Sequence, residues 1–358
     1  AVAIREAVAR AGLSGDDVDE AFVGCVLPAG VGQAPARQAV LGAGLPISVP
    51  STTVGKVCGS GMKALMFGHD TIVAGNAKIV VAGGMESMSN APYLLDRARG
   101  GYRLGHGRVI DHMFFDGLED AYAKGRLMGT FAEDAAAHFQ FTREAQDDYA
   151  LASLDRSLKA ISSGAFAGEV VPVTTRTATI SIDEQPGKAK RDKIRMLKPA
   201  FRDGGTVTAA NSSSISDGAA AVTLMRMSEA EKRGLTPLAV VKGHAGHAAE
   251  PAWFTTAPVG AMTKLLDRIG WTKDDVDLFE INEAFAVVAL IAMREMGLGH
   301  EQVNVHGGAC ALGHPIGASG ARIVVTLLAA LKTHGLKRGV ASLCIGGGEA
   351  TAMAFELV

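Results

Sequence analysis

An internal repeat constrains this chain more than any other feature. The segment AGLSGDDVDEAFVG at residues 11–24 is similar to IGWTKDDVDLFEIN at residues 269–282, and their DDVD runs begin 258 residues apart. GSGMKAL at residues 59–65 is similar to GASGARI at residues 317–323, at the same offset. A constant offset predicts two duplicated halves. The alternative is chance similarity between strands that are rich in small residues.

Apolar runs alternate with amphipathic stretches along both repeats. Strands are predicted at residues 20–27, 51–57 and 78–84, with helices at residues 1–13 and within the glycine-rich stretch 30–43. Alternating strands and helices predict an α/β fold whose sheets carry helices on their faces. Ligands of such folds bind where strand ends meet, so we expect the site between the two halves.

The repeat also suggests a domain division. Residues 1–86 plus 205–228 form the predicted N-terminal half, and residues 229–358 form the C-terminal half. Residues 87–204 have no counterpart and are predicted to form an inserted lid. Because the chain lacks an initiator Met and opens inside a helical pattern, further residues are expected before Ala1.

Composition excludes several classes of protein. The net charge of −2 gives no reason to expect nucleic acid or an anionic membrane as partner. No apolar run reaches the roughly 18 residues that a membrane span needs, and no signal peptide is visible. Four cysteines in 358 residues are too few for a disulfide framework, so a reducing, cytoplasmic compartment is predicted. An organelle transit peptide ahead of Ala1 is the alternative.

Cys58, in the stretch VCGSGMKA, is a candidate nucleophile. The helical spacing that follows places it at a helix N-terminus, which is expected to lower the pKa of its thiol. Gly59 and Gly61 leave room for a substrate to approach the sulfur. The alternative is a buried, inert cysteine.

Reactive residues also occur in three further turns. These are NEAF at Asn282–Phe285, GHPIGASG with His314, and CIGGGE beginning at Cys344. Since Cys58 and His314 lead into matching helices, a pseudo-twofold axis is expected to bring them together as an activated thiol pair. A second cysteine suits a base that works at carbon after the first is acylated.

Two other site types are weighed against this one. His306, Cys310 and His314 have metal-like spacing, but intervening glycines and Pro315 interrupt any helix that would align them, so no metal site is predicted. GASG lacks the dinucleotide-binding pattern. Cys25 and Cys310 lie in apolar surroundings and are expected to be inert.

Together these motifs resemble the thiolase family, and within it the acetyl-CoA C-acetyltransferases. GQAPARQA, GGMESMSNAP and GTVTAANSSSISDGAAA are similar to further family segments, so the resemblance covers the whole chain. It implies a layered α/β/α/β/α core of two βαβ halves with an inserted loop domain. It also implies a first strand of the N-terminal half before Ala1. Ser212 and His306 depart from the family pattern, where Ala and Asn are common.

The resemblance implies a role for each motif. Cys58 is the expected nucleophile and His314 its activator, and Cys344 is the expected general acid and base. Asn282 is expected to hold a water in one oxyanion hole, and the N–H of Gly346 to contribute to the other. The implied reaction joins two acetyl-CoA molecules into acetoacetyl-CoA, or reverses it by thiolysis. Alternatives are a broader 3-ketoacyl-CoA thiolase, a decarboxylating ketoacyl synthase, or a non-catalytic CoA-binding protein.

The resemblance also implies the substrate contacts. Coenzyme A thioesters are the expected ligands, with no permanently bound cofactor, and the protein is expected to be a homotetramer or, alternatively, a dimer. Pantetheine would lie near Ser213 and Ala209. Expected apolar contacts to the substrate are Leu197, Phe201, Phe285, Met128 and Phe254. Lys188, Lys190 and Arg191 would contact the phosphates, although a basic run can equally be a solvated face.

Overall fold

The computed structural model describes all residues, 1–358, and contains two four-stranded sheets. The N-terminal sheet has the order β2-β1-β3-β8, and the C-terminal sheet has the order β10-β11-β12-β9. The strands of the first sheet are β1 (Glu20–Gly24), β2 (Ser51–Val54), β3 (Ile79–Ser87) and β8 (Asp217–Met225). Those of the second are β9 (Ala239–Ala248), β10 (Leu278–Ile281), β11 (Arg338–Ile345) and β12 (Glu349–Leu357).

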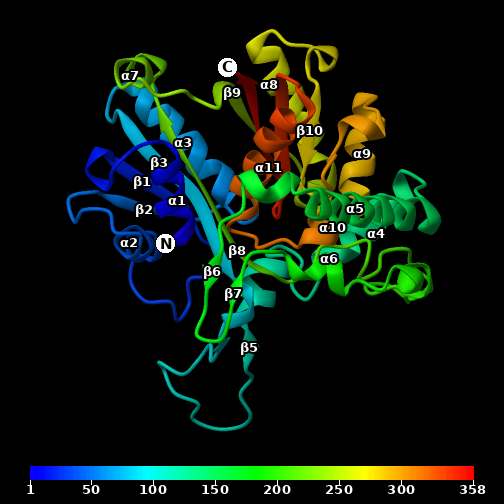
Figure 1. The fold of residues 1–358 in the computed structure, drawn as a ribbon. Helices are drawn as coiled ribbons and strands as arrows, with labels where there is room; N and C mark the ends of the chain where they lie inside the picture. Colours follow the sequence, from blue (N-terminus) through cyan, green and yellow to red (C-terminus); the bar gives the residue numbers. More distant parts are fainter.

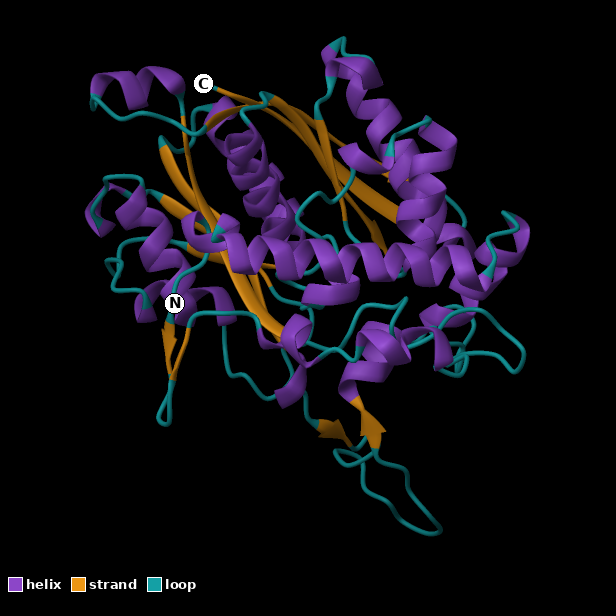
Figure 2. Ribbon diagram, turned by 45° about the vertical axis from the view of Figure 1, so that its right-hand side comes forward, coloured by secondary structure: helices purple, strands orange, loops and turns teal.

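The predicted layers are present (Figure 1). Two helices, α3 (Ser60–Ala74) and α11 (Ser319–His334), lie between the sheets, and their apolar side chains share one buried cluster with β10, β11 and β12. The outer helices are α1 (Val2–Arg10) and α2 (Pro35–Gly42) on the N-terminal sheet and α8 (Ala257–Ile269) on the C-terminal sheet, with α9 (Ala286–Met296) packed against α8. The short helix α7 (Met227–Lys232) follows β8, and α10 (Ala309–Leu312) packs against helices from residues 143–188. In Figure 2, helices lie between the two sheets and outside them.

The two DDVD runs make the same hydrogen bonds in their respective halves, which confirms the duplication. Asp19 Oδ2 accepts hydrogen bonds from the N–H groups of Lys78 (2.7 Å) and Ile79 (2.9 Å) at the start of β3. In the other half, Asp277 Oδ2 binds the N–H groups of Lys337 (2.9 Å) and Arg338 (2.8 Å) at the start of β11 in the same way. Each aspartate therefore ties its own strand to the neighbouring one.

The structure corrects the predicted offset for part of the repeat. β1 pairs with β3 through Ala21 and Val81, and β10 pairs with β11 through Phe279 and Val340. The first strands are thus 258 residues apart and the second strands 259. Helices α3 and α11 begin at serines that are also 259 residues apart, so GSG aligns with ASG rather than GAS.

Two predicted strands end earlier than expected. β1 stops at Gly24 because the N–H groups of Val26 and Leu27 turn away to bind the carboxylate of Glu86, at 2.9 and 3.1 Å. β2 stops at Val54, since the chain turns there toward Cys58.

Residues 87–204, which are predicted to form an inserted lid, also contribute to the core. Helix α4 (Met128–His138) contributes Phe131 and three alanines to the largest buried cluster, alongside α8 and α9. The other insert elements are α5 (Arg143–Ser163), α6 (Glu184–Lys188) and the hairpins β4–β5 (Tyr93–Leu94, Ile110–Asp111) and β6–β7 (Val173–Thr174, Thr179–Ile180). The loop between β4 and β5 projects from the body (Figure 1).

Short helical turns connect these elements. They are η1 (Gly15–Asp17), η2 (Met88–Asn90), η3 (Phe114–Leu118), η4 (Ala165–Gly168), η5 (Arg191–Met196), η6 (Pro251–Thr256), η7 (Lys273–Asp275) and η8 (His300–Gln302). No helix combines the length and the apolar character that crossing a membrane requires. The strand expected before Ala1 lies outside these residues and stays a prediction.

Candidate active site

Cys58 lies in a tight turn between β2 and α3. Val57, the residue before it, has φ of 44°, a left-handed conformation that β-branched residues rarely adopt. Ser60 holds this turn: its Oγ accepts the N–H of Lys56 (2.8 Å) and donates to the carbonyl of Val57 (2.7 Å). Strained backbone persists only where surrounding contacts fix it, and it clusters at functional sites.

The Cys58 thiol is partly buried, and burial raises its pKa to about 11. The prediction that the helix lowers this pKa is therefore wrong, because lost solvation outweighs the helix N-terminus. The N–H groups of Gly346 and of Cys58 itself hydrogen-bond the sulfur and lower its pKa, whereas the charge of Glu86 raises it. Burial raises the pKa values of the other three cysteines further, so Cys58 remains the most acidic thiol.

A hydrogen bond fixes the tautomer of His314. Ser319 Oγ donates its only proton to the carbonyl of Pro315 (3.0 Å), so it accepts a proton from His314 Nδ1, 2.5 Å away. Nε2 is left with a free lone pair. Burial, together with the charge of Arg322, lowers the pKa of His314 to about 3. The imidazole is therefore neutral near pH 7 and can accept a proton at Nε2.

Asn282 follows β10 and faces His314. Its Nδ2 lies 3.4 Å from Nε2 and 3.5 Å from Nδ1 of that imidazole. The Oδ1 of Asn282 is buried and has no hydrogen-bond partner in the protein. Since an unpaired buried polar atom costs about 1–3 kcal/mol, this carbonyl is suited to bind a water or another donor.

Glu283, the next residue, is structurally central and was missed by sequence reasoning. Its buried carboxylate accepts four hydrogen bonds that tie Asn282's turn to α5 and to the segment before α11. The donors are Tyr149 Oη (3.0 Å), Ser153 Oγ (2.7 Å), Asn304 Nδ2 (2.9 Å) and the N–H of Cys310 (3.0 Å). Its position directly after a buried strand was the available signal, but only the fold reveals its partners.

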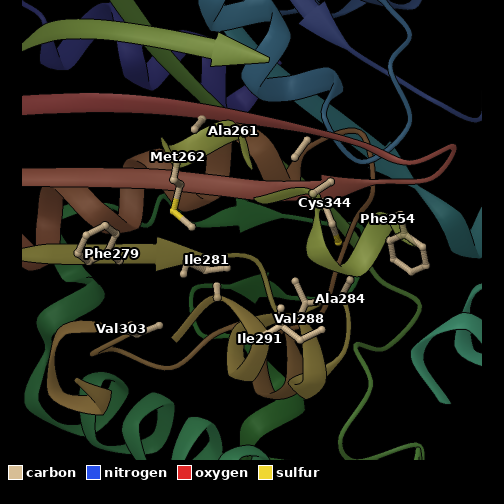
Figure 3. Close-up of a cluster of buried hydrophobic side chains, with 14 of the residues drawn as sticks. Phe254, Ala261, Met262, Phe279, Ile281, Ala284, Val288, Ile291, Val303 and Cys344 are labelled. Carbon is tan, nitrogen blue, oxygen red and sulfur yellow. The ribbon is translucent and has the colours of Figure 1, made fainter. Parts of the chain in front are cut away.

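Cys344 lies near the end of β11 and is fully buried. Burial raises its pKa well above the ordinary value, and the charge of nearby Cys58 raises it further. Figure 3 shows the Cys344 side chain among the apolar residues of the C-terminal half, on the same side as Phe254 and Ala284. The two sulfurs are therefore neighbours, although they come from opposite halves.

The glycine turn after Cys344 packs against the Cys58 turn. A Cβ on Gly346 would lie 3.6 Å from Val57 Cγ1 and 3.7 Å from Met128 Sδ. Gly347 and Gly348 have φ of 92° and 86°, which favours glycine at both positions. An ion pair between Lys56 and Glu349 joins the two turns across the halves.

Glycines bring the two halves into backbone contact; we call this contact between the starts of α3 and α11 the seam. A Cβ on Gly24 would lie 2.6 Å from the nitrogen of Gly61 and 2.7 Å from the carbonyl oxygen of Gly317. Glu86, which sequence reasoning also missed, locks the seam by accepting the N–H of Gly317 at 2.9 Å. The predicted meeting of Cys58 with the His314 loop thus has a direct physical cause.

Family comparison agrees with this geometry. Residues 1–228 match the family described as "Thiolase, N-terminal domain", and residues 235–357 match "Thiolase, C-terminal domain". The chain belongs to the thiolase family of acyltransferases. It is 51% identical over 365 residues to "Acetyl-CoA acetyltransferase 2" of Arabidopsis thaliana, which covers all of this thiolase and 90% of that protein.

Solved structures show the same thiolase fold. The acetyl-CoA acetyltransferase of Bacillus anthracis superposes with a TM-score of 0.95 at 41% identity, covering 99% of this chain and 91% of that one. The Acat5 thiolase of Ascaris suum, solved in complex with coenzyme A, superposes with a TM-score of 0.94 at 42% identity and the same coverage.

The apolar contacts expected for the thiolase substrate form a continuous wall. Phe201 meets Phe285 edge to face at 6.0 Å between ring centroids, and Phe285 meets Phe254 at 6.4 Å. Met128 packs on the same cluster, which also contains Cys344. The structure therefore brings four of the five predicted apolar residues together beside the second cysteine.

The remaining predicted contacts lie around that wall. Ser213 is partly buried, and its N–H donates to the carbonyl of Ala284 at 3.0 Å, beside the NEAF turn. Ala209 is exposed, and Leu197 is 37% exposed.

The basic run of this thiolase is more neutralised than its sequence indicates. Only one acid occurs within it, but neighbouring acids reach it: Lys188 pairs with Glu184, four residues earlier in α6, and Arg191 pairs with Asp155 of α5 at 2.8 Å. Lys190 makes no ion pair. Of the three predicted phosphate contacts, Lys190 is thus the free cation.

His306, Cys310 and His314, whose spacing resembles that of metal ligands, do not lie together in the structure. His306 Nε2 contacts His334 Nε2 at 3.3 Å, Cys310 binds Glu283, and His314 faces Asn282. Each of the three residues therefore serves a different neighbourhood.

Proposed function

We propose that this thiolase is an acetyl-CoA acetyltransferase that joins two acetyl-CoA molecules into acetoacetyl-CoA and free CoA, reversibly, through an acetyl group carried on Cys58. The observation that carries this proposal is that the partly buried Cys58 and the fully buried Cys344 come from turns in contact, with the tautomer-fixed imidazole of His314 in the loop that enters the seam. A thiol that attacks a carbonyl and a thiol that works at carbon are what a two-step acyl transfer to carbon requires. The relatives' names point to the same activity.

In the first half-reaction, Cys58 Sγ attacks the thioester carbonyl, and its proton moves to His314 Nε2. The N–H groups of Cys58 and Gly346 stabilise the oxyanion; each such donor contributes about 2.7–4 kcal/mol. CoA leaves as a thiol after taking the proton of Cys344. The enzyme then holds an acetyl thioester, a protonated His314 and a Cys344 thiolate, so charge is balanced inside the site.

In the second half-reaction, the Cys344 thiolate removes a proton from the methyl group of a second acetyl-CoA. The enolate oxygen is stabilised by His314 Nε2–H and by a water held at Asn282. The carbanion attacks the acetyl carbonyl, Cys58 leaves, and His314 returns its proton. All groups are restored, which makes the cycle reversible.

Apolar packing supports an acetyl rather than a longer acyl chain. Met128 and Phe254 both pack in the cluster that holds Cys344, where the reacting carbon must lie. Lys190 is the proposed phosphate contact for the nucleotide. We also propose a cytoplasmic homotetramer, with a dimer as alternative; exposed Tyr93, Leu95 and Leu104 on the projecting loop are suited to such contacts.

A thiolysis assay tests the proposal. The protein is incubated with acetoacetyl-CoA and CoA while the diketide absorbance is followed, and its mass is measured intact to detect one acetyl adduct. Loss of absorbance with an adduct on the Cys58 peptide is expected. Activity with malonyl-CoA but not with acetyl-CoA would instead indicate a decarboxylating synthase.

A further inference from the structure

A second cluster of reactive side chains lies away from the catalytic cysteines. His69 and Asp70 come from α3, and His244 comes from β9 of the other half. His69 Nδ1 lies 3.2 Å from Asp70 Oδ1, and His244 Nε2 lies 2.8 Å from the same oxygen. One ligand atom from each residue lies within 4.8 Å of the others, and the two rings meet edge to face at 5.1 Å.

We propose that His69, Asp70 and His244 form a site for a divalent transition-metal ion such as Zn²⁺, which links α3 to β9. Two imidazoles and one carboxylate are a donor set that Zn²⁺ accepts, at about 2.0–2.2 Å from each ligand. Tetrahedral ligands at that range lie about 3.3 Å apart. The observed separations of 3.2 and 2.8 Å require only a small outward shift of one imidazole.

The surroundings leave a path to solvent for the ion and a water as fourth ligand. The His244 and His69 side chains are 14% and 27% exposed, whereas Asp70 is 53% exposed. Arg268 Nη1 donates to the carbonyl of His244 at 2.7 Å and so fixes the backbone of that ligand. The charge of Lys63 opposes a cation here, and the Asp70 carboxylate offsets it.

Distance along α3 separates the proposed site from the catalytic turns. His69 lies about 14 Å along α3 from Ser60, given a rise of about 1.5 Å per residue. The site is therefore separate from the seam, and an ion in it would clamp the two halves at a second point.

Zinc chloride titration by calorimetry tests the site on the full chain with any purification tag removed. We expect one Zn²⁺ per chain, and loss of this binding in both His69→Ala and His244→Ala. His247→Ala is the matched control, since His247 also lies on β9 but its ring packs on Gly260 of α8. The melting temperature should rise with zinc in the wild type and the control only.

Cobalt(II) serves as a second probe because it distinguishes sulfur from nitrogen ligands. Visible bands without a sulfur-to-cobalt charge-transfer band are expected for two imidazoles and a carboxylate. A sulfur charge-transfer band, zinc binding that persists in both histidine variants, or no binding at all would each overturn the proposal.

Discussion

The two halves begin their central helices with the same residue and use it differently. Ser60 opens α3 and binds only backbone, the N–H of Lys56 and the carbonyl of Val57. Ser319 opens α11, and its hydroxyl also accepts the Nδ1 proton of an imidazole. One serine thus shapes the turn that carries the nucleophile, whereas its counterpart sets the tautomer of the base. Duplication supplied the scaffold, and the residues just before each helix supplied the different chemistry.

Replacing each reactive cysteine with alanine should have the largest effect, because the two cysteines lie in different halves and act in different half-reactions. Cys344→Ala retains Cys58 and His314, so the acetyl adduct should still form, with His314 passing the Cys58 proton to the leaving CoA, while condensation falls by about 10²–10⁴-fold because the base is lost. Cys58→Ala should form no adduct but still exchange the methyl protons of acetyl-CoA with deuterated water, with His314 taking the proton that leaves Cys344. Intact mass spectrometry and NMR measure the two outcomes. Wild-type condensation by Cys344→Ala would contradict the two-thiol mechanism.

Alkylation should rank the thiols of the free enzyme. With its pKa raised to about 11, Cys58 has little thiolate at neutral pH, and the thiolate fraction grows as pH rises. The iodoacetamide rate should increase about tenfold per pH unit, or about 10³-fold from pH 7.5 to 10.5. Peptide mapping should find Cys58 labelled first, ahead of buried Cys344. A labelling rate that levels off near pH 8 would mean that the helix N-terminus lowers the pKa of Cys58 more than burial raises it.

Asn282→Ala tests the amide that follows β10. Removing a group that supports the enolate only in the transition state should reduce kcat by about 10²–10³-fold with little change in KM. Steady-state kinetics with acetyl-CoA measures both constants. Unchanged kcat would mean that NEAF is only a structural turn.

The paired serines offer a smaller and more direct comparison. Ser319→Ala frees the His314 tautomer, and we expect kcat to fall about tenfold, the equivalent of one hydrogen bond of about 1.4 kcal/mol. Ser60→Ala leaves two backbone groups unpaired, so the free energy of unfolding should drop by about 1–3 kcal/mol. Kinetics and urea unfolding on both variants separate the two roles. If the two variants changed kcat equally and the free energy of unfolding equally, the two serines would not have different roles.

The insert has no counterpart, and its cations should give the smallest effect. Replacing Lys188, Lys190 and Arg191 with Ala should raise KM for acetyl-CoA a few-fold, since exposed charge contacts contribute about 0.2–1 kcal/mol each. A pantetheine thioester without the nucleotide should be unaffected. Lys190→Ala alone should account for most of the change, because the other two cations are already paired. Equal changes with both substrates would indicate lost stability instead.

The features that could be predicted from the sequence are those that a local pattern or the internal repeat records. The DDVD runs, the glycine stops and the spacing of α3 located both halves and the four reactive residues. The pKa of Cys58 was predicted in the wrong direction because a helix start is visible in sequence, whereas burial beneath the other half is not. The partners of Glu86 and Glu283, and the acid that neutralises Arg191, come from distant elements. The left-handed Val57 likewise depends on contacts that no local pattern records.

The seam has a mechanical consequence. Where Gly24, Gly61 and Gly317 meet backbone to backbone, no side chain lies in the contact that could change its rotamer and let the halves move. The halves therefore cannot swing about a hinge between them, as the lobes of many two-part enzymes do. The sulfurs of Cys58 and Cys344 and the imidazole of His314 are therefore expected to keep their spacing through the reaction cycle.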